Sequence, residues 1–413
     1  MGGTLLLGLV LRLYSITDKC FWYDEVMYGS RVKFFADPFH LFAVGDSNPP
    51  LYYLFLKCWT SLFGASIFSM RSASVLTALL SVYLIYRIGT KLYDNRVGLW
   101  SPFFLAINPF PLFYSQEVGN YSLLMLLALV LVHFILAVRE KAAFRRYLGF
   151  FLCLVPFLLT NFSGIFFVSA LIVYFMAASR RYPSCRVLFW ITFLTASLYA
   201  AVSMVLFDLN PEIYTHLVRC MSWIQKVPFF RVLQSLFEVF SYGGADFGGK
   251  DVRPHGSSIV FGRFVTVLFA GLLCKGMFFP DDETKNEKKE LLGIWLFGPI
   301  IFGWVFSLVF FPLYVIRYFI YSLGAFIILA ARGLVTVRSG LLKWVFCGLA
   351  VLLLSVPVYN YYTDELKMPW DEVLEYLTEE DLNYDDIVVF NPFFQSRVLQ
   401  YHLLYFKGSW KYE

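Results

Sequence analysis

Long apolar runs separated by short polar segments dominate the hydropathy pattern of the chain. Most runs hold about 20 residues, the length that an α-helix needs to cross the hydrocarbon core of a bilayer. They are too long and continuous for the short alternating strands of a transmembrane barrel. The pattern therefore predicts an all-α polytopic membrane protein. The runs cover residues 2–16, 69–88, 97–115, 120–138, 147–178, 187–207, 258–279, 291–311, 318–335 and 341–360.

Basic residues gather on alternate connections between these runs, and such connections face the cytoplasm. The run 147–178 has basic clusters at both ends, so it must leave and return to the same side. Its 32 residues are too few for two full-thickness helices of about 20 residues each. We therefore expect two short or re-entrant helices that turn near 160–164, eleven spans in total, and a C-terminus on the outer side. The basic connections lie near 87–96, 139–146, 180–186, 285–289 and 332–343.

The outer segment 17–68 mixes aromatic residues with single charges, which suits helices that lie in the membrane interface. We expect two such helices, at 24–35 and 50–63. The apolar run before this segment holds only about 15 residues, fewer than a full span needs. We expect a short span there rather than a cleaved signal peptide, because no basic residue precedes the run.

Two further outer segments carry enough polar residues to hold chemistry. The segment 208–257 ends in the glycine-rich stretch 243–250, and we expect a loop with a mobile flap. The tail from about 361 combines an amphipathic helical stretch with a buried-strand pattern at 385–390, which favours a small soluble α/β cap. On the inner side, the charged patch 281–290 is expected to be a solvated loop.

The composition agrees with the membrane assignment. Hydrophobic residues make up 59% of the chain and charged residues only 15%, against about 25% charged residues in soluble domains. The net charge of +5 is modest and gives no support for nucleic-acid binding. The seven cysteines contain no CxxC pair, which argues against a zinc site.

Two adjacent acids, Asp24 and Glu25, end the sequence FWYDE directly after the first run. Partial desolvation at the membrane boundary raises the basicity of a carboxylate, so a general base is one use of this pair. An interfacial aromatic belt followed by ordinary solvated acids accounts for the motif equally well. Both residues are taken forward as catalytic candidates.

A second motif, NPPLYY, covers Asn48–Tyr53 in the same outer segment. Its two prolines fix an extended entry to the helix that follows, because proline is tolerated in a first helical turn. The motif lies about 25 residues after Asp24, so both can face one cavity. Taken alone, a Pro-Pro turn is an ordinary structural feature.

Three arginines, Arg12, Arg71 and Arg317, lie at the outer ends of predicted spans. A buried cation near the membrane boundary is costly unless it is paired, so each is a candidate for a functional site. Snorkelling of the guanidinium to lipid headgroups is an equally strong alternative for each of them.

Seven short motifs follow one another in a set order: Arg12 in a short first span, WYDE, NPPLYY, W…LFG at Trp59–Gly64, RSAS at Arg71–Ser74, SQEVGNYSLL at Ser115–Leu124 and IRYF at Ile316–Phe319. This order resembles the GT-C glycosyltransferases, and most closely glycosyltransferase family 39 with its bacterial relatives, which include protein O-mannosyltransferases and aminoarabinose transferases of lipid A. The resemblance is strong over residues 1–140, weak to about 335 and absent in the tail. One departure is Gly119 and Asn120, where relatives commonly have Arg-Pro before the tyrosine.

The resemblance implies a GT-C fold and a transferase that uses a sugar linked to a polyprenyl phosphate or pyrophosphate, at the outer face of the inner membrane. It assigns the catalytic acid to Asp24, with Glu25 as the neighbouring acid. We expect an inverting, metal-independent transfer in which Asp24 is the general base. Arg317 and Arg71 are expected to bind the donor phosphate. Expected substrate contacts are Asn48, Tyr52, Tyr53 and Tyr121.

On this interpretation, residues 1–335 form the transmembrane catalytic module, with a core at 1–206 and an outer loop at 208–257. Residues 336–413 form the last span and an outer cap. The expected partners are a polyprenyl-phosphate sugar donor, a lipid, glycan or protein acceptor, and membrane lipids, but no nucleic acid. No cofactor is expected, and a divalent metal held by carboxylates is the alternative, because some GT-C enzymes use one.

The main rival is a non-catalytic lipid or solute transporter, since eleven spans with intramembrane breaks also suit that class. Transporter folds often show matched halves with paired broken helices, and no such halves are visible here. A relative with a decayed active site is a third alternative, suggested by Gly119. The intact acids Asp24 and Glu25 argue against it.

Overall fold

The computed structural model describes five stretches of the chain, and every regular element within them is a helix. Seven of the described helices are long and apolar enough to cross a bilayer, and two shorter apolar helices, α1 (Gly2–Leu13) and α10 (Gly164–Ala178), accompany them. The all-α polytopic membrane fold expected from the hydropathy pattern is therefore confirmed. The described residues are 1–34, 48–209, 224–243, 256–279 and 283–363, with Trp370, Glu372, Val373, Val398, Leu399 and Tyr401.

All of the predicted apolar runs are helical, and the number of them that cross the membrane stays a prediction. The remaining elements, in chain order, are α2 (Tyr23–Phe34), α4 (Leu51–Phe63), α5 (Ile67–Leu92), α6 (Asn95–Ile107), α7 (Pro109–Ser115), α8 (Tyr121–Glu140), α9 (Phe144–Leu158), α11 (Pro183–Leu209), α13 (Phe229–Tyr242), α14 (Gly256–Phe278), α15 (Glu283–Val309), the 3₁₀ helix η1 (Ile316–Ser322), α16 (Leu323–Val335) and α17 (Gly340–Thr363).

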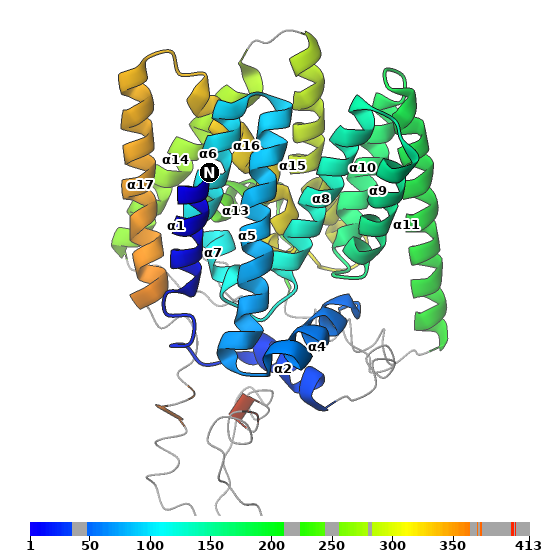
Figure 1. The fold of residues 1–413 in the computed structure, drawn as a ribbon, viewed down its shortest axis with the longest axis vertical. Coiled ribbons are helices and arrows are strands. Elements are labelled where there is room, and N and C mark those ends of the chain that lie inside the picture. Colours follow the sequence, from blue (N-terminus) through cyan, green and yellow to red (C-terminus); the bar gives the residue numbers. More distant parts are fainter. Residues whose placement is uncertain are drawn as a thin grey trace, which may run out of the picture.

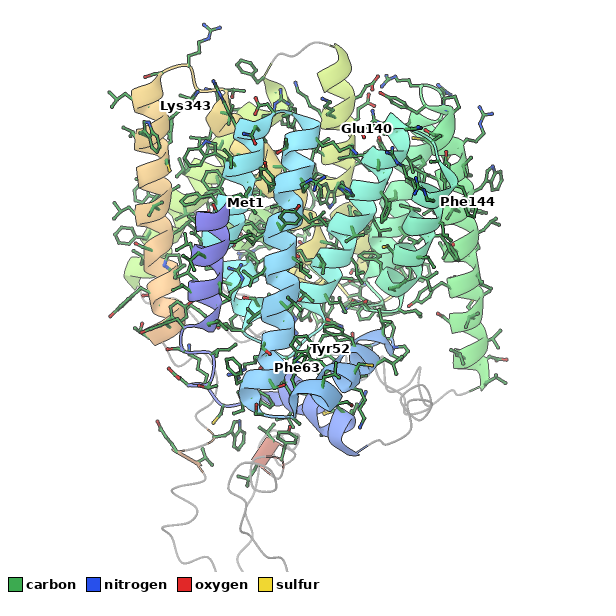
Figure 2. The ribbon with its side chains drawn as sticks, in the orientation of Figure 1. Met1, Tyr52, Phe63, Glu140, Phe144 and Lys343 are labelled. Carbon is green, nitrogen blue, oxygen red and sulfur yellow. The ribbon has the colours of Figure 1, made fainter. Side chains whose placement is uncertain are left out.

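The long helices form one bundle with two different ends (Figure 1). Glu140, Phe144 and Lys343 lie at one end, and Tyr52 and Phe63 lie at the other (Figure 2). The first end carries the basic connections and is called the basic end. At the opposite end, α2 and α4 lie across the ends of the spans, as expected for two interfacial helices (Figure 1).

Ion pairs join the connections at the basic end. Lys91 Nζ lies 2.9 Å from Glu140 Oε2, and Arg139 Nη2 lies 3.1 Å from Glu287 Oε2. The Arg139 guanidinium also covers the ring of Tyr182 at 4.1 Å. Because the pairs are partly exposed, each contributes at most about 1 kcal/mol. They fix which helices neighbour one another more than they stabilise the bundle.

The run 147–178 forms two short helices, as its length predicts. α9 and α10 hold 15 residues each, about 22 Å at 1.5 Å per residue, which is less than the 30 Å core of a bilayer. They turn at Thr160–Ser163, where the Asn161 carbonyl accepts the N–H of Gly164 at 3.0 Å.

The predicted span 97–115 is not one helix, because it divides into α6 and α7 at Asn108. Pro109 has no N–H for the carbonyl of Leu105, four residues before it. The N–H of Phe110 donates to Asn108 Oδ1 at 2.9 Å and so caps α7. The break leaves carbonyls at the end of α6 that need other donors.

Arg12 of α1 supplies those donors. Its Nη1 donates to the carbonyl of Ala106 at 3.1 Å, and its Nη2 lies 3.5 Å from the carbonyl of Leu105. The side chain is fully buried. Arg12 therefore caps a broken helix from inside the bundle, and the structure gives it this role in place of a cation at the outer surface.

Two elements differ from the sequence prediction. The outer segment 208–257 contains the amphipathic helix α13, whose carbonyl at Phe240 accepts from Asn108 Nδ2 at 2.8 Å. The charged patch 281–290 continues into α15 instead of forming a loop throughout. The glycine-rich stretch 243–250, beyond its first residue, and the strand pattern 385–390 lie outside the described residues.

Two separate apolar cores organise the described residues. The larger core lies among the spans. The smaller one, called the outer core, lies under α2 and α4, and four of its members come from the C-terminal tail. The outer core consists of Phe21, Val26, Tyr28, Val32, Tyr52, Tyr53, Leu56, Met70, Val118, Leu123, Trp370, Val398, Leu399 and Tyr401.

Candidate functional site

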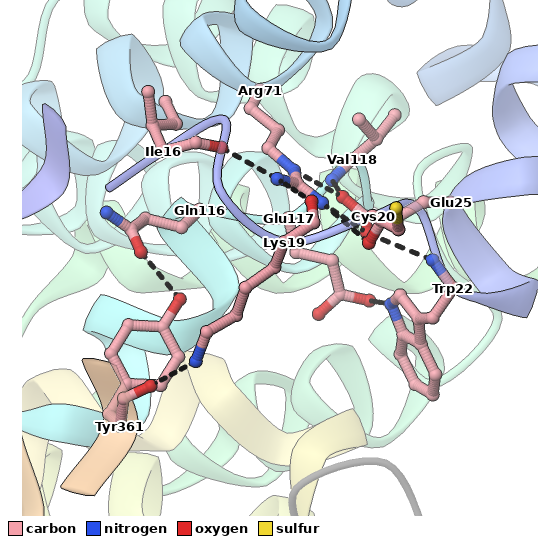
Figure 3. Close-up of polar contacts among 10 residues, drawn as sticks. All are labelled: Ile16, Lys19, Cys20, Trp22, Glu25, Arg71, Gln116, Glu117, Val118 and Tyr361. Carbon is pink, nitrogen blue, oxygen red and sulfur yellow. Dashed lines mark hydrogen bonds and ion pairs between the residues drawn. The ribbon is translucent and has the colours of Figure 1, made fainter. Parts of the chain in front are cut away.

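The two adjacent acids at the start of α2 have different surroundings. Glu25 is fully buried and forms a two-pronged ion pair with Arg71 of α5, with Nε–Oε1 at 2.8 Å and Nη2–Oε2 at 2.9 Å (Figure 3). Asp24 is half-buried. Of the two acids, Asp24 alone keeps a side chain that is partly exposed.

The guanidinium of Arg71 uses all five of its N–H donors within the protein. Two go to Glu25, and the other three go to the carbonyls of Ile16 at 2.6 Å, Lys19 at 2.8 Å and Cys20 at 3.2 Å (Figure 3). Arg71 thus fixes the irregular segment that leads from α1 into α2. Its geometry is that of a residue that positions the loop.

The polar segment between α7 and α8 completes the surroundings of Glu25. The N–H of Val118 donates to Glu25 Oε1 at 3.0 Å, and Glu117 Oε1 accepts the indole N–H of Trp22 at 2.8 Å (Figure 3). Gln116 Oε1 accepts from the phenol of Tyr361 at 2.6 Å. One short segment therefore holds α2 and α17 in place together.

Arg317 lies in η1, directly before α16, and is 7% exposed. It interacts electrostatically with Asp24 and with the phenols of Tyr114, Tyr121 and Tyr318. Asp24, Tyr121 and Arg317 therefore lie within electrostatic range of one another, although Asp24 and Arg317 are almost 300 residues apart in the sequence.

Tyrosine rings surround this cation. Tyr121 and Tyr318 stack with centroids 6.5 Å apart, and Tyr114 contacts Tyr121 at 4.7 Å. The guanidinium of Arg317 lies 5.8 Å from the centroid of the Tyr318 ring. A fixed positive charge within an aromatic wall, beside a half-buried carboxylate, is suited to stabilise an anion that forms during a reaction.

The NPPLYY motif is attached to two other parts of the site. Asn48 Oδ1 accepts from Asn120 Nδ2 and from Asn161 Nδ2, each at 3.3 Å. Asn120 Nδ2 also donates to the carbonyl of Thr160 at 3.1 Å. Asn120 thereby joins the first outer segment to the turn between α9 and α10.

The turn between α9 and α10 also contacts η1, the element that carries Arg317. The Ser163 hydroxyl donates to the carbonyl of Tyr318 at 2.8 Å, and the Tyr321 phenol donates to the carbonyl of Ser163 at 2.9 Å. A continuous set of hydrogen bonds therefore runs from Asn48 through the turn to the residues that flank Arg317.

Tyr52 and Tyr53 lie inside the outer core, 1% and 2% exposed. The ring of Tyr52 meets that of Tyr28 edge-on at 4.8 Å, and burial raises the pKa of the Tyr52 phenol. The phenol oxygen of Tyr53 accepts from Arg31 Nη1 at 3.0 Å. The structure therefore buries both tyrosines in the outer core, where their rings are not exposed to a substrate.

Sequence reasoning missed the separate roles of Gln116, Glu117 and Val118. Their signal in the sequence is a polar stretch, SQEVGN, between two apolar runs. A metal centre finds no support in the part of the chain that the structure describes, where no group of three or more His, Cys, Asp and Glu side chains could hold an ion. The expectation that the reaction needs no metal stays a prediction.

Comparison with protein families gives one match. Residues 47–207 match the model described as dolichyl-phosphate-mannose-protein mannosyltransferase. Asp24 and Arg317 both lie outside the matched range. A comparison with curated protein sequences finds no match.

Comparison with solved structures gives similar proteins over almost the whole chain. ArnT from Cupriavidus metallidurans in the apo state has a TM-score of 0.59 at 16% identity, over 96% of this chain and 67% of that one. ArnT bound to undecaprenyl phosphate has a TM-score of 0.57 at 16% identity, over 97% and 68%. The oligosaccharyltransferase from Archaeoglobus fulgidus in the apo form has a TM-score of 0.56 at 13% identity, over 96% and 59%.

The chain thus spans about two thirds of ArnT and less of the oligosaccharyltransferase. At these identities the structural likeness establishes the fold, which is the GT-C fold of membrane glycosyltransferases. Together with the family match, it confirms the resemblance inferred from the order of the motifs.

Proposed function

We propose that this protein transfers a sugar from a polyprenyl-phosphate donor to an acceptor at the non-cytoplasmic face of the cell membrane. The observation that carries the proposal is a half-buried acid, Asp24, within electrostatic range of the buried cation Arg317. The GT-C fold and the mannosyltransferase match support it. So does the structure of ArnT bound to undecaprenyl phosphate.

The proposed reaction is a single inverting displacement. The oxygen or nitrogen of the acceptor forms a bond to the anomeric carbon of the sugar. As this bond forms, Asp24 takes the proton from the acceptor hydroxyl or amine. The bond between that carbon and the phosphate oxygen breaks, and the lipid phosphate leaves with the electron pair. Negative charge grows on the phosphate as the bond breaks, so a fixed cation lowers the barrier. Arg317 is the residue to which we assign that charge.

Arg71 receives a different role from the one expected for it. Its five N–H donors are used by Glu25 and three carbonyls, so we assign it to holding α2 rather than to binding phosphate. Asn48 and Tyr121 remain our candidates for contacts with the sugar. For Tyr52 and Tyr53 we assign a supporting role in the outer core, because both are buried there.

The test is transfer by membranes that contain the Asp24→Asn variant, supplied with polyprenyl-linked sugar donors. Asn keeps the size of Asp but cannot accept a proton, so turnover should fall by about two to four orders of magnitude while donor binding is retained. The matched control is Asp18→Asn, an exposed acid in the same outer segment. Transfer that survives in Asp24→Asn would refute the general-base mechanism.

The rival transporter makes the opposite prediction. A transporter that does not couple this site to protons should keep its function in Asp24→Asn. Mass spectrometry of membrane glycolipids and surface glycans, from cells with and without the intact gene, identifies the donor and the acceptor. The loss of one glycan modification would support the transferase, and unchanged glycans with an altered lipid distribution would favour the transporter.

A further inference from the structure

The C-terminal tail contributes to the same apolar core as α2, the helix that carries Asp24. Trp370, Val398, Leu399 and Tyr401 are between 1% and 7% exposed, and all four belong to the outer core. Figure 1 shows the last helical residues, in red, beside α2 at the end opposite the basic end. The tail lies outside residues 47–207, which the family model matches, and no motif in its sequence predicts where it docks.

The central contact joins Tyr401 to Gly29 of α2. A Cβ atom added at Gly29 would lie 2.6 Å from the Tyr401 phenol oxygen and 3.2 Å from its Cζ. Gly29 lies inside a helix, where any residue could adopt its backbone conformation. The Tyr401 phenol therefore occupies the space that a side chain at position 29 would take.

Tyr401 also ends a column of side chains that leads to the acid pair. Its ring stacks on Phe21 with centroids 6.2 Å apart. The Arg71 guanidinium lies 5.1 Å from the centroid of the same Phe21 ring, and this guanidinium forms the ion pair with Glu25. All of these side chains are almost fully buried, so a shift of Tyr401 is passed to the start of α2 by direct packing.

We propose that Tyr401 is a positioning residue, which docks the C-terminal tail in the notch at Gly29 and holds α2 in its active geometry. The docking itself is independent of the chemistry. Its effect on sugar transfer rests on the function proposed above, because α2 carries Asp24. Undocking should lower turnover and leave donor binding unchanged, because Arg317 lies on a different element.

Gly29→Ala tests the docking by the sign of its effect. Alanine is a better helix former than glycine, so in the absence of the tail contact this change should stabilise α2. With Tyr401 in the notch, the added methyl group collides with the phenol and should destabilise the docked state. The effect of Gly29→Ala on the stability of α2 therefore has opposite signs with and without the Tyr401 contact.

The measurement is hydrogen–deuterium exchange of the α2 amides, which reports local opening. It compares full-length protein with Gly29→Ala, Tyr401→Ala and the double variant. In the native background, Gly29→Ala should increase exchange across α2. In the Tyr401→Ala background, the same change should decrease it. Equal effects of Gly29→Ala in both backgrounds would overturn the docking.

Tyr401→Phe gives a second, milder test. It removes the phenol oxygen, which is the atom nearest to the added methyl group, so Gly29→Ala should be less harmful in the Tyr401→Phe background than in the native protein. Tyr359→Ala is the matched control, because Tyr359 is 67% exposed on α17. If Tyr359→Ala raises exchange in α2 as much as Tyr401→Ala does, the effect is unspecific and the proposal fails.

Transfer kinetics separate this inference from the proposed function. Tyr401→Ala should lower kcat by about tenfold or more, because small displacements of a catalytic group are costly, with donor binding unchanged. Faster exchange in α2 with normal kcat would refute the positioning role while the docking stands. If the unmodified protein transfers no sugar in any assay, the proposed function fails and the exchange data still decide the docking.

Discussion

At the scale of single residues, the adjacent acids Asp24 and Glu25 of one helix differ in burial and in their charged neighbours. Consecutive side chains on an α-helix are turned by about 100° around its axis. Glu25 therefore points into the protein against Arg71, while Asp24 stays half-buried within the electrostatic range of Arg317. The sequence identifies the pair, but it does not show which acid is buried. That depends on Arg71 and Val118, which hold the Glu25 carboxylate and are distant in the chain.

Glu25→Gln should lower the stability of the protein, and any loss of turnover should follow from that. The substitution removes one charge of a fully buried ion pair and leaves the Arg71 guanidinium uncompensated, which typically costs about 3–5 kcal/mol. Thermal unfolding in detergent should show a clear loss for Glu25→Gln and almost none for Asp24→Asn. A Glu25→Gln protein with unchanged stability and lost turnover would place Glu25, and not Asp24, in the reaction.

Arg317→Ala should weaken donor binding by about tenfold or more, because a charge-assisted contact to phosphate is stronger than a neutral one. Since loss of a buried arginine can also disturb folding, Arg317→Lys is measured beside it and should retain part of the binding. Arg231→Ala, an exposed arginine on α13, serves as the control. Donor binding equal to that of the unmodified protein would remove Arg317 from the site.

At the scale of helices, periodicity and hydropathy predict the spans and the two interfacial helices, because lipid demands long apolar stretches. The same signals miss the break between α6 and α7, since both halves of that run are apolar. Pro109 is visible in the sequence, but Arg12, which caps the broken end, lies almost 100 residues earlier. The proline is a local signal for a break, but the residue that caps the broken end is distant in the sequence, so local patterns cannot identify it.

Asn120→Ala tests whether the turn between α9 and α10 supports the site. The change removes hydrogen bonds to Asn48 and to the Thr160 carbonyl, and it should lower the free energy of unfolding by about 1–3 kcal/mol. Because Asn48 lies in the outer segment that we assign to the substrate, transfer should fall as well. Asn95→Ala, at the basic end, is the control and should alter neither.

Transfer and stability that are both normal in Asn120→Ala would show that the link between the outer segment and the turn is not needed. A loss of stability with full transfer would restrict Asn120 to a structural role.

At the scale of the whole molecule, two ends with different chemistry define a direction across the membrane. The basic connections and their ion pairs lie at one end, and α2, α4 and the described tail residues lie at the other (Figures 1 and 2). The alternation of basic loops predicts this separation from the sequence. The docking of the tail could not be predicted, because it depends on a close fit between Gly29 and Tyr401 and not on any pattern.

The direction itself can be tested by labelling single cysteines from either side of the membrane. The positive-inside rule predicts that the basic end faces the cytoplasm and that Asp24 faces outward. In a background from which all seven native cysteines have been removed, Ser61→Cys should react with an impermeant thiol reagent added outside intact cells. Ser339→Cys, exposed at the other end, should react only after the membrane is opened. The reverse pattern would place the site in the cytoplasm and overturn the proposed orientation, together with the donor leaflet that the mechanism requires.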